Sequence, residues 1–379
     1  MLDYEMLKVI WWLFVGVLLV GFAVMDGHDM GVGTLLPFVG KGDDERRVVI
    51  NTVGPHWDGN QVWFITGGGA IFAAWPLVYA TAFSGFYWAM AAVLWSLFFR
   101  PVGFDYRSKI DNSTWRSAWD WGLFVSGTVP PLIFGVAFGN LLQGVPFYFD
   151  NDLRSFYTGG FWALLNPFAL LTGLVSTSMI VMHGANFLLI RTEGDVYKRS
   201  QKASVLFGLL TLATFAAAGL WVASSIKGFV LTGGDLPNAL PNPMDKSVMV
   251  QAGAWLHNYS VYPLTMLIPA LGFLGALLSI VFAKVNQPVM AFISSAMSML
   301  GIIGTAGVSM FPFIMPSSTD PRSSLTVWDS VSSHMTLELM FFATLILLPL
   351  VVFYTSWAYR VMSGKVTLDF VEHNDHSAY

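Results

Sequence analysis

The 379-residue chain contains no cysteine and few charged residues. Without cysteine it can form no disulfide, thiolate metal site, c-type haem attachment or cysteine nucleophile. Charged residues make up only 11% of the chain, against about 25% in soluble globular proteins, and the net charge of −4 offers no basic surface for nucleic acid. Hydrophobic residues make up 55% and the mean hydropathy is +0.61. A water-soluble fold cannot bury that much apolar surface, so the sequence predicts an integral membrane protein.

Long stretches without Asp, Glu, Lys or Arg mark the expected crossings. The longest has 41 residues, 59–99, and would extend roughly 60 Å as a helix, which is enough for two crossings with a turn at Pro76. The stretches are continuously apolar and lack the alternation of barrel strands, which favours an all-α fold. We predict one polytopic domain, 1–379, with nine transmembrane helices near residues 8–27, 57–76, 78–99, 121–142, 163–190, 203–226, 261–283, 289–311 and 334–360.

The basic residues predict the orientation of these helices. Of the 19 Lys and Arg residues, 14 fall on connections of one side. The positive-inside rule then places the N-terminus in the periplasm and the C-terminus in the cytoplasm. The first helix is expected to remain in the mature protein, because acidic residues precede it and no cleavage site follows it. The longest outer segment, 227–260, is rich in Gly and Pro and is predicted to be an irregular loop.

Acidic residues gather where the first two predicted helices begin or end on the cytoplasmic side. Asp26 and Asp29 are predicted to end the first helix, on one face, with His28 between them. The second helix opens with residues 57–60, which include Asp58. Acids converging at membrane depth are typical of a proton relay. The alternative is that Asp58 only caps its helix, because an acid at that end satisfies free N–H groups.

Basic residues follow the third predicted helix at the same side of the membrane. Arg100 and Arg107 are interpreted first as topology anchors whose side chains reach the head groups. A second hypothesis pairs Arg100 with Asp105, which would close the cytoplasmic mouth of the proton path.

The remaining histidines give a weak case for haem or metal binding. His183 and His257 lie near predicted helix ends and are interpreted as hydrogen-bonded residues rather than haem ligands. His334 and Glu338 are four residues apart and could share a helix face, but an exposed chance pair is the favoured interpretation. The sequence therefore predicts no metal ligand in this chain.

Several strings in order along the chain resemble subunit II of the cytochrome bd-type ubiquinol oxidases, in the proteobacterial branch. The first is Gly-Phe-Ala-Val-Met-Asp-Gly-His-Asp-Met-Gly-Val-Gly at 21–33, and the second is Pro-His-Trp-Asp-Gly-Asn-Gln-Val-Trp at 55–63. The others lie at 72–76, 83–87, 98–109, 137–147, 310–318 and 325–329. The resemblance covers the whole chain.

The resemblance implies a non-haem subunit of a quinol:oxygen oxidoreductase in the bacterial inner membrane, with no catalytic residue of its own. It implies nine helices in two four-helix groups plus a peripheral helix. Haem b, haem d and the quinol site would belong to the partner, subunit I, and a very small single-helix accessory subunit would join them. A structural ubiquinone would bind in this chain. The complex would oxidise quinol, reduce oxygen to water and contribute to the proton motive force.

The resemblance also implies roles for five residues. Asp58 matches an acid that brings cytoplasmic protons toward the haem site of subunit I, and Asp29 matches the acid of the first-helix signature. Trp57 and Asn60 flank that path by position. Trp63 corresponds to a tryptophan near an oxygen entrance.

Three questions stay open at this stage. The family pattern often has Phe where this chain has His28, which either adds a titratable group beside Asp29 or fills the same space. Nine apolar helices with a few buried acids would, without the motifs, equally predict a secondary transporter of a small solute or a proton-coupled porter. A purely structural scaffold is the third hypothesis, and it would tolerate neutral substitutions at Asp29 and Asp58.

Overall fold

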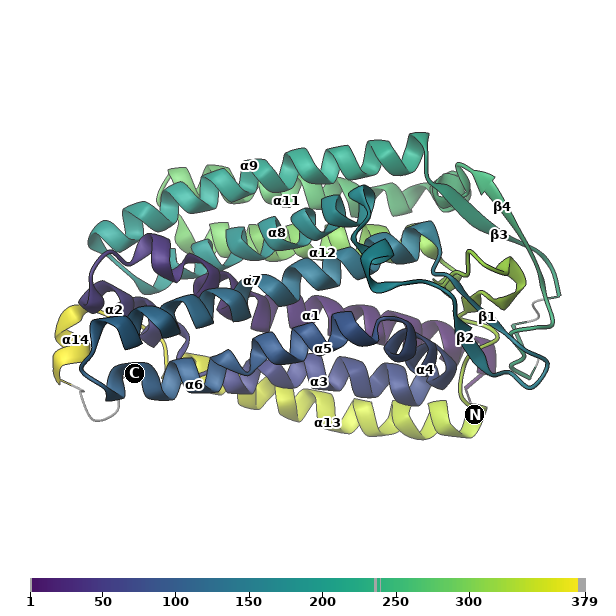
Figure 1. Ribbon diagram of the computed structural model, residues 1–379, viewed down its shortest axis with the longest axis horizontal. Coiled ribbons are helices and arrows are strands. Elements are labelled where there is room, and N and C mark those ends of the chain that lie inside the picture. The colour runs from purple at the N-terminus through teal and green to yellow at the C-terminus, as the bar shows by residue number, and fades with distance from the viewer. Residues whose placement is uncertain (1, 235–236, 239, 374–379) are drawn as a thin grey trace.

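Long apolar helices run side by side along the molecule, and small β-hairpins gather at one end (Figure 1). The computed structural model describes residues 2–234, 237–238 and 240–373. The long helices are α1 (Tyr4–Val39), α3 (Trp57–Ala74), α7 (Ser113–Gln143), α8 (Pro167–Arg191), α9 (Gly194–Ser224), α11 (Leu267–Lys284), α12 (Pro288–Met310) and α13 (His334–Val361). The shorter ones are α2 (Asp43–Val53), α4 (Pro76–Gly85), α5 (Tyr87–Leu97), α6 (Phe99–Tyr106), α10 (His257–Val261) and α14 (Leu368–His373).

The mostly helical membrane fold is confirmed, within the ranges that the structure describes. Seven helices there are long and apolar enough to cross a membrane, or up to eight if a bent pair counts as one span. The bent pair is α3 and α4, which meet at an angle of 120°. Pro76 is the first residue of α4, where its missing N–H costs nothing, and its ring prevents α3 from continuing. The chain therefore turns at the predicted place, but the predicted helix 78–99 is divided among α4, α5 and α6.

The helices pack in two sets around α1. One set consists of α8, α9, α11 and α12, and on the other side α1 packs against α3 and α7 while α5 packs on α7. Helix α1 also contacts α8 closely, because Gly31 and Gly184 face each other: a Cβ on Gly184 would lie only 2.5 Å from the carbonyl carbon of Gly31. Helix α13 lies at the edge of the bundle, against α1 and α3, and leaves most of its surface uncovered (Figure 1).

Three antiparallel hairpins lie at the end of the molecule that holds the N-terminus (Figure 1). They pair β1 (Phe147–Phe149) with β2 (Ser155–Tyr157), β3 (Lys227–Gly233) with β4 (Ser247–Ala252), and β5 (Phe313–Met315) with β6 (Leu325–Thr326). The prediction of an irregular loop over 227–260 is therefore wrong for β3 and β4. Apolar and β-branched residues on both strands favour pairing, and Phe229 is buried against Trp255 and Phe313. The connection between β3 and β4 includes 235–236 and 239, which lie outside the described residues.

The opposite end of the molecule is held by ion pairs. Arg107, in the 3₁₀ helix η1 (Arg107–Lys109), lies 2.6 Å from Asp120 of α7 and 2.9 Å from Asp43 of α2, and Arg46 reaches the same Asp120 at 2.7 Å. Burial favours the neutral form of Arg107, but the hydrogen bond and the charge of Asp120 outweigh it and raise the pKa of the guanidinium. Arg107 is thus a buried member of an ion-pair network rather than the head-group anchor that the sequence predicted.

Candidate functional site

The acidic cluster lies inside α1, not at its end. The sequence predicted that the first helix stops near residue 27, but α1 continues for another three turns to Val39. Asp26, His28 and Asp29 are all buried there. The prediction rested on the stretch without charged residues, which ends at Asp26. The helix continues because the glycines beside these residues pack closely against α7 and α8, which keeps the polar side chains inside the bundle.

Asp26 forms a buried ion pair with Arg100 of α6. The Arg100 Nη1 and Asp26 Oδ1 atoms are 2.6 Å apart, and both side chains are nearly inaccessible. The Asp105 side chain is exposed. The predicted Arg100–Asp105 pair is therefore corrected to Arg100–Asp26, because Arg100 turns inward toward α1. The charge of Asp26 is compensated within the chain.

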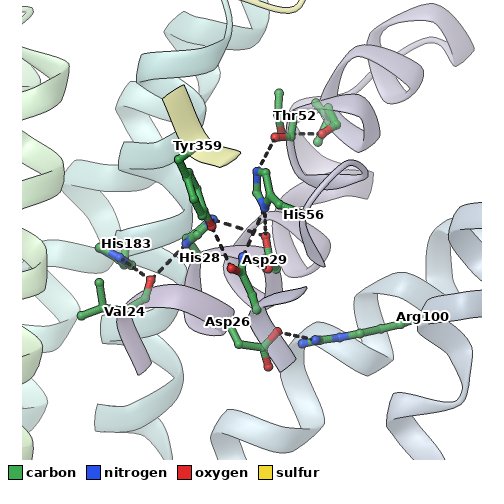
Figure 2. Close-up of polar contacts among 11 residues, drawn as sticks. Val24, Asp26, His28, Asp29, Thr52, His56, Arg100, His183 and Tyr359 are labelled. Carbon is green, nitrogen blue, oxygen red and sulfur yellow. Dashed lines mark hydrogen bonds and ion pairs between the residues drawn. The ribbon is translucent and has the colours of Figure 1, made fainter. Parts of the chain in front are cut away.

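Asp29 is surrounded by polar side chains from α1, from α13, and from α3 with the turn before it (Figure 2). Asn60 of α3 donates through Nδ2 to Asp29 Oδ2 at 2.7 Å. The other carboxylate oxygen, Oδ1, lies 3.3 Å from His28 Nε2 and 3.5 Å from His56 Nδ1. Among the described residues no donor makes a hydrogen bond to Oδ1. A buried carboxylate oxygen without a donor is costly, which singles this cluster out as a candidate functional site.

Tyr359 of α13 closes the cluster, and sequence reasoning missed it. Its hydroxyl donates to Asn60 Oδ1 at 2.9 Å and lies 3.5 Å from His28 Nε2, while its ring stacks near that of His56 (Figure 2). Tyr359 lies 299 positions after Asn60 in the chain. No local pattern could connect it with α3, and only the packing of α13 against α1 and α3 brings it there.

The other histidines have structural partners. His183 of α8 is fully buried, with Nδ1 2.7 Å from Ser295 Oγ and Nε2 3.1 Å from the Val24 carbonyl oxygen. The prediction that it is hydrogen-bonded is confirmed, although it belongs to the bundle interior. His334 binds the N-terminal segment, since its Nε2 lies 2.7 Å from the Leu2 carbonyl oxygen. His257 is exposed.

The three predicted residues around Asn60 point in different directions. Asp58 is exposed on the first turn of α3. Trp57 is buried and stacks on Phe104 with ring centroids 5.1 Å apart. Trp63 is half-buried and packs where α3 meets α1. The structure therefore brings Asn60 and Asp29 together but leaves Asp58 on the surface of this chain.

Comparison with known proteins decides the family. The family model described as cytochrome bd terminal oxidase subunit II matches residues 7–362. The chain belongs to this family. It is 54% identical to the cytochrome bd-I ubiquinol oxidase subunit 2 of Escherichia coli K12 and 53% identical to the probable cytochrome oxidase subunit 2 of Haemophilus influenzae, each over the full length of both chains. The fold is also similar to a chain of the bd oxidase from Geobacillus thermodenitrificans, with a TM-score of 0.68 and 14% identity over 94% of this chain and 98% of that one.

Membership in the subunit II family answers the main question left by the sequence. The chain is a multi-pass bacterial membrane subunit of a bd-type quinol oxidase, an oxidoreductase complex in which subunit I is its partner. The transporter hypothesis is thereby set aside.

Proposed function

We propose that this chain conducts protons from the cytoplasm toward the redox centre of the oxidase, along Asp58, Asn60 and Asp29. Oxygen reduction to water consumes protons, whereas quinol oxidation releases them. Taking the consumed protons from the cytoplasm and releasing the others outside separates charge across the membrane. The observation that carries the proposal is the 2.7 Å hydrogen bond between Asn60 and Asp29, with Asp58 at the exposed start of the same helix.

The groups along this route have different capacities for a proton. Asp58 and Asp29 can each take up and release one, whereas the Asn60 amide only holds Asp29 in place. Asp26 is tied to Arg100 at 2.6 Å, which leaves Asp29 as the carboxyl group available for transfer. Trp57 covers the route from the side of α6 through its stack on Phe104.

Asp58 lies on a surface that we assign to subunit I. An exposed charge on a membrane-spanning helix is unfavourable in lipid, so a protein partner is expected to cover it. The neighbouring surface of α3 and α5 carries large exposed apolar side chains, among them Val62, Ile65, Trp88 and Trp95. Such a surface suits contact with another helical subunit, and this contact would lead protons from Asp58 and Asp29 into subunit I. A very small single-helix accessory subunit belongs to the same proposed assembly.

The orientation and the count of nine spans are part of this proposal. Counting α5 with α6 as one span and α3 as another gives nine, in two four-helix groups with α13 peripheral. The N-terminus and α14, near the C-terminus, lie at opposite ends of the bundle, which agrees with an odd number of crossings (Figure 1). The ion-pair network of Arg46 and Arg107 lies at the end near α14, which supports a cytoplasmic C-terminus in the bacterial inner membrane.

The proposed cofactors divide between the two subunits. The haem b and haem d groups would belong to subunit I, which supplies the electron transfer and the oxygen chemistry. In this chain a cavity of about 560 Å³ opens between α1, α7, α8, α9 and α12. Its wall is almost wholly apolar, with Phe22, Met179 and Phe215 among its side chains and Tyr259 and Ser309 as polar groups. Such a cavity fits a structural ubiquinone, whose ring offers acceptors and whose tail is apolar.

Trp63 has a weaker proposed role at an oxygen entrance. Its ring fills the space over Gly21, where a Cβ would lie 2.5 Å from the indole. This contact supports a packing role at the crossing of α1 and α3. The place of Trp63 on an oxygen path stays a prediction.

The test is Asp58→Asn in the complex purified with subunit I. We expect oxygen consumption per haem to fall at least about 10-fold with haem content unchanged, because the amide cannot relay a proton. Asp105→Asn is the matched control, since Asp105 is an exposed acid on α6 outside the proposed route. Full activity of Asp58→Asn would discard the relay role, and loss of all haem would assign Asp58 to assembly instead.

A further inference from the structure

The rings of His28 and His56 are held so that both present a lone pair to Asp29. His28 Nδ1 lies 3.0 Å from the carbonyl oxygen of Val24, and His56 Nε2 lies 3.1 Å from that of Thr52 (Figure 2). A carbonyl oxygen can only accept, so each of these nitrogens carries the proton. In the neutral rings the opposite nitrogens, His28 Nε2 and His56 Nδ1, are therefore acceptors.

Three acceptor atoms consequently face one another inside the bundle. One ligand atom from each of His28, Asp29 and His56 can be chosen so that all three lie within 4.8 Å of one another. Two polar groups approach these nitrogens within the part of the chain that the structure describes: Asn60 Nδ2 lies 3.2 Å from His56 Nδ1, and the Tyr359 hydroxyl lies 3.5 Å from His28 Nε2. Converging lone pairs repel each other unless a cation lies between them.

We propose that His28, Asp29 and His56 form a binding site for a divalent transition-metal ion of the Zn²⁺ class. Bonds of about 2.0–2.2 Å in a tetrahedral site place neighbouring ligand atoms roughly 3.4 Å apart. The separations of 3.3 Å and 3.5 Å from Asp29 Oδ1 to the two imidazole nitrogens match that spacing. Two imidazoles and a carboxylate favour zinc or a similar ion over Mg²⁺ and Ca²⁺, which prefer oxygen ligands.

The surroundings of the three ligands resemble the support that metal sites require. Each imidazole donates its other N–H to a backbone carbonyl, which fixes the ring, and Asn60 holds the second oxygen of Asp29. The Tyr359 hydroxyl lies 3.5 Å from His28 Nε2 and adds an oxygen atom at the edge of the cluster. Exposed Pro55 adjoins His56, so the site lies close to the surface at the start of α3. On binding, Asn60 would give up its contact with His56.

A metal ion at this site would inhibit the oxidase reversibly. It would occupy the carboxylate oxygen of Asp29 and bring positive charge onto the route that we propose for protons. This consequence rests on the proposed function, whereas the binding itself does not.

The binding experiment uses the purified oxidase complex after treatment with a chelator. We expect equilibrium dialysis against Zn²⁺, with metal measured by mass spectrometry, to show one high-affinity equivalent that His28→Phe loses, with affinity reduced at least about 100-fold. Phe preserves the ring that stacks on Phe187 at 4.2 Å. The exposed His257 supplies the control, and His257→Phe is expected to bind zinc like the wild type. Zinc X-ray absorption should report nitrogen and oxygen ligands, including imidazole.

Activity measurements separate this proposal from the proton route. His28→Phe should resist zinc concentrations that inhibit the wild type, with the oxygen consumption of each complex expressed relative to its own rate without zinc. Zinc that binds through His28 without inhibiting would support the metal site and contradict the role of Asp29 in proton transfer. Equal zinc binding by the wild type and His28→Phe would overturn the metal site. The proposed proton route would still be tested independently by Asp58→Asn. If His28→Phe does not assemble, His56→Gln provides the same comparison.

Discussion

Two regions of this molecule bury polar side chains between helices, and they do so with different kinds of side chain. Between α8, α9, α11 and α12, several buried uncharged side chains hydrogen-bond one another. Asn186 donates to Ser279 at 2.7 Å and accepts from Ser204 at 2.6 Å, and His183 contacts Ser295 at 2.7 Å. Interhelical hydrogen bonds of this kind hold helices together in a membrane.

The second region, between α1, α3, α6 and α13, contains charges instead. Asp26 needs Arg100, and Asp29 keeps one oxygen without a hydrogen-bond donor. Burying charge costs several kcal/mol, and a neutral network would hold the same helices at lower cost. The first region is thus built for packing, and the second is the one to which we assign the proposed proton route and cation site.

Arg100→Gln should produce the largest effect, because it leaves the buried Asp26 carboxyl group without its partner. Breaking a buried pair in this way costs about 3–5 kcal/mol, so we expect oxygen consumption and assembly both to collapse. The measurement is haem content and oxygen consumption of the purified complex. Adding Asp26→Asn should restore assembly, and Arg116→Gln, in a half-exposed pair with Asp43, should behave like the wild type. A stable and active Arg100→Gln complex would contradict the conclusion that the second region depends on a buried charge pair.

Asn186→Leu tests the neutral region and should have an intermediate effect. It leaves the Ser204 and Ser279 hydroxyls without their partner, and interhelical hydrogen bonds in membranes are worth about 0.6–2 kcal/mol. We expect the Tm of the complex to fall by a few degrees, as followed by thermal denaturation, with oxygen consumption per haem unchanged. A loss of activity at unchanged Tm would place Asn186 among the functional residues instead.

Lys198→Ala should have the smallest effect. Lys198 and Asp195 form a pair three residues apart with both side chains about 70% exposed, at 72% and 70%. Exposed pairs contribute about 0.2–0.5 kcal/mol at most. The same thermal denaturation should show a change in Tm below about 1 °C. A larger shift would mean that exposed ion pairs also contribute to the stability of the complex, and not only the two buried regions.

Much of the bundle could be predicted because lipid imposes a local rule on the sequence. Every crossing needs a long apolar helix, so uncharged stretches located α7, α8, α11 and α12 to within several residues. The predicted end of the first helix was wrong, because the stretch without charges stops at Asp26 whereas α1 continues through the buried acids to Val39. Asn60 and Asp29 were correctly assigned to one cluster, whereas the partner of Arg100 was wrong and Tyr359 was missed.

The sequence by itself determined that this chain is an integral membrane protein, where most of its spans lie, and which family it resembles. Those conclusions rest on composition, on stretches of neighbouring residues and on short motifs. Only the tertiary structure decided that Arg100 neutralises Asp26, that Tyr359 closes the cluster, and that two imidazole lone pairs face Asp29. These contacts join α1 to α6, α13 and the turn before α3, and a pairing between distant segments depends on how the helices pack rather than on any local pattern.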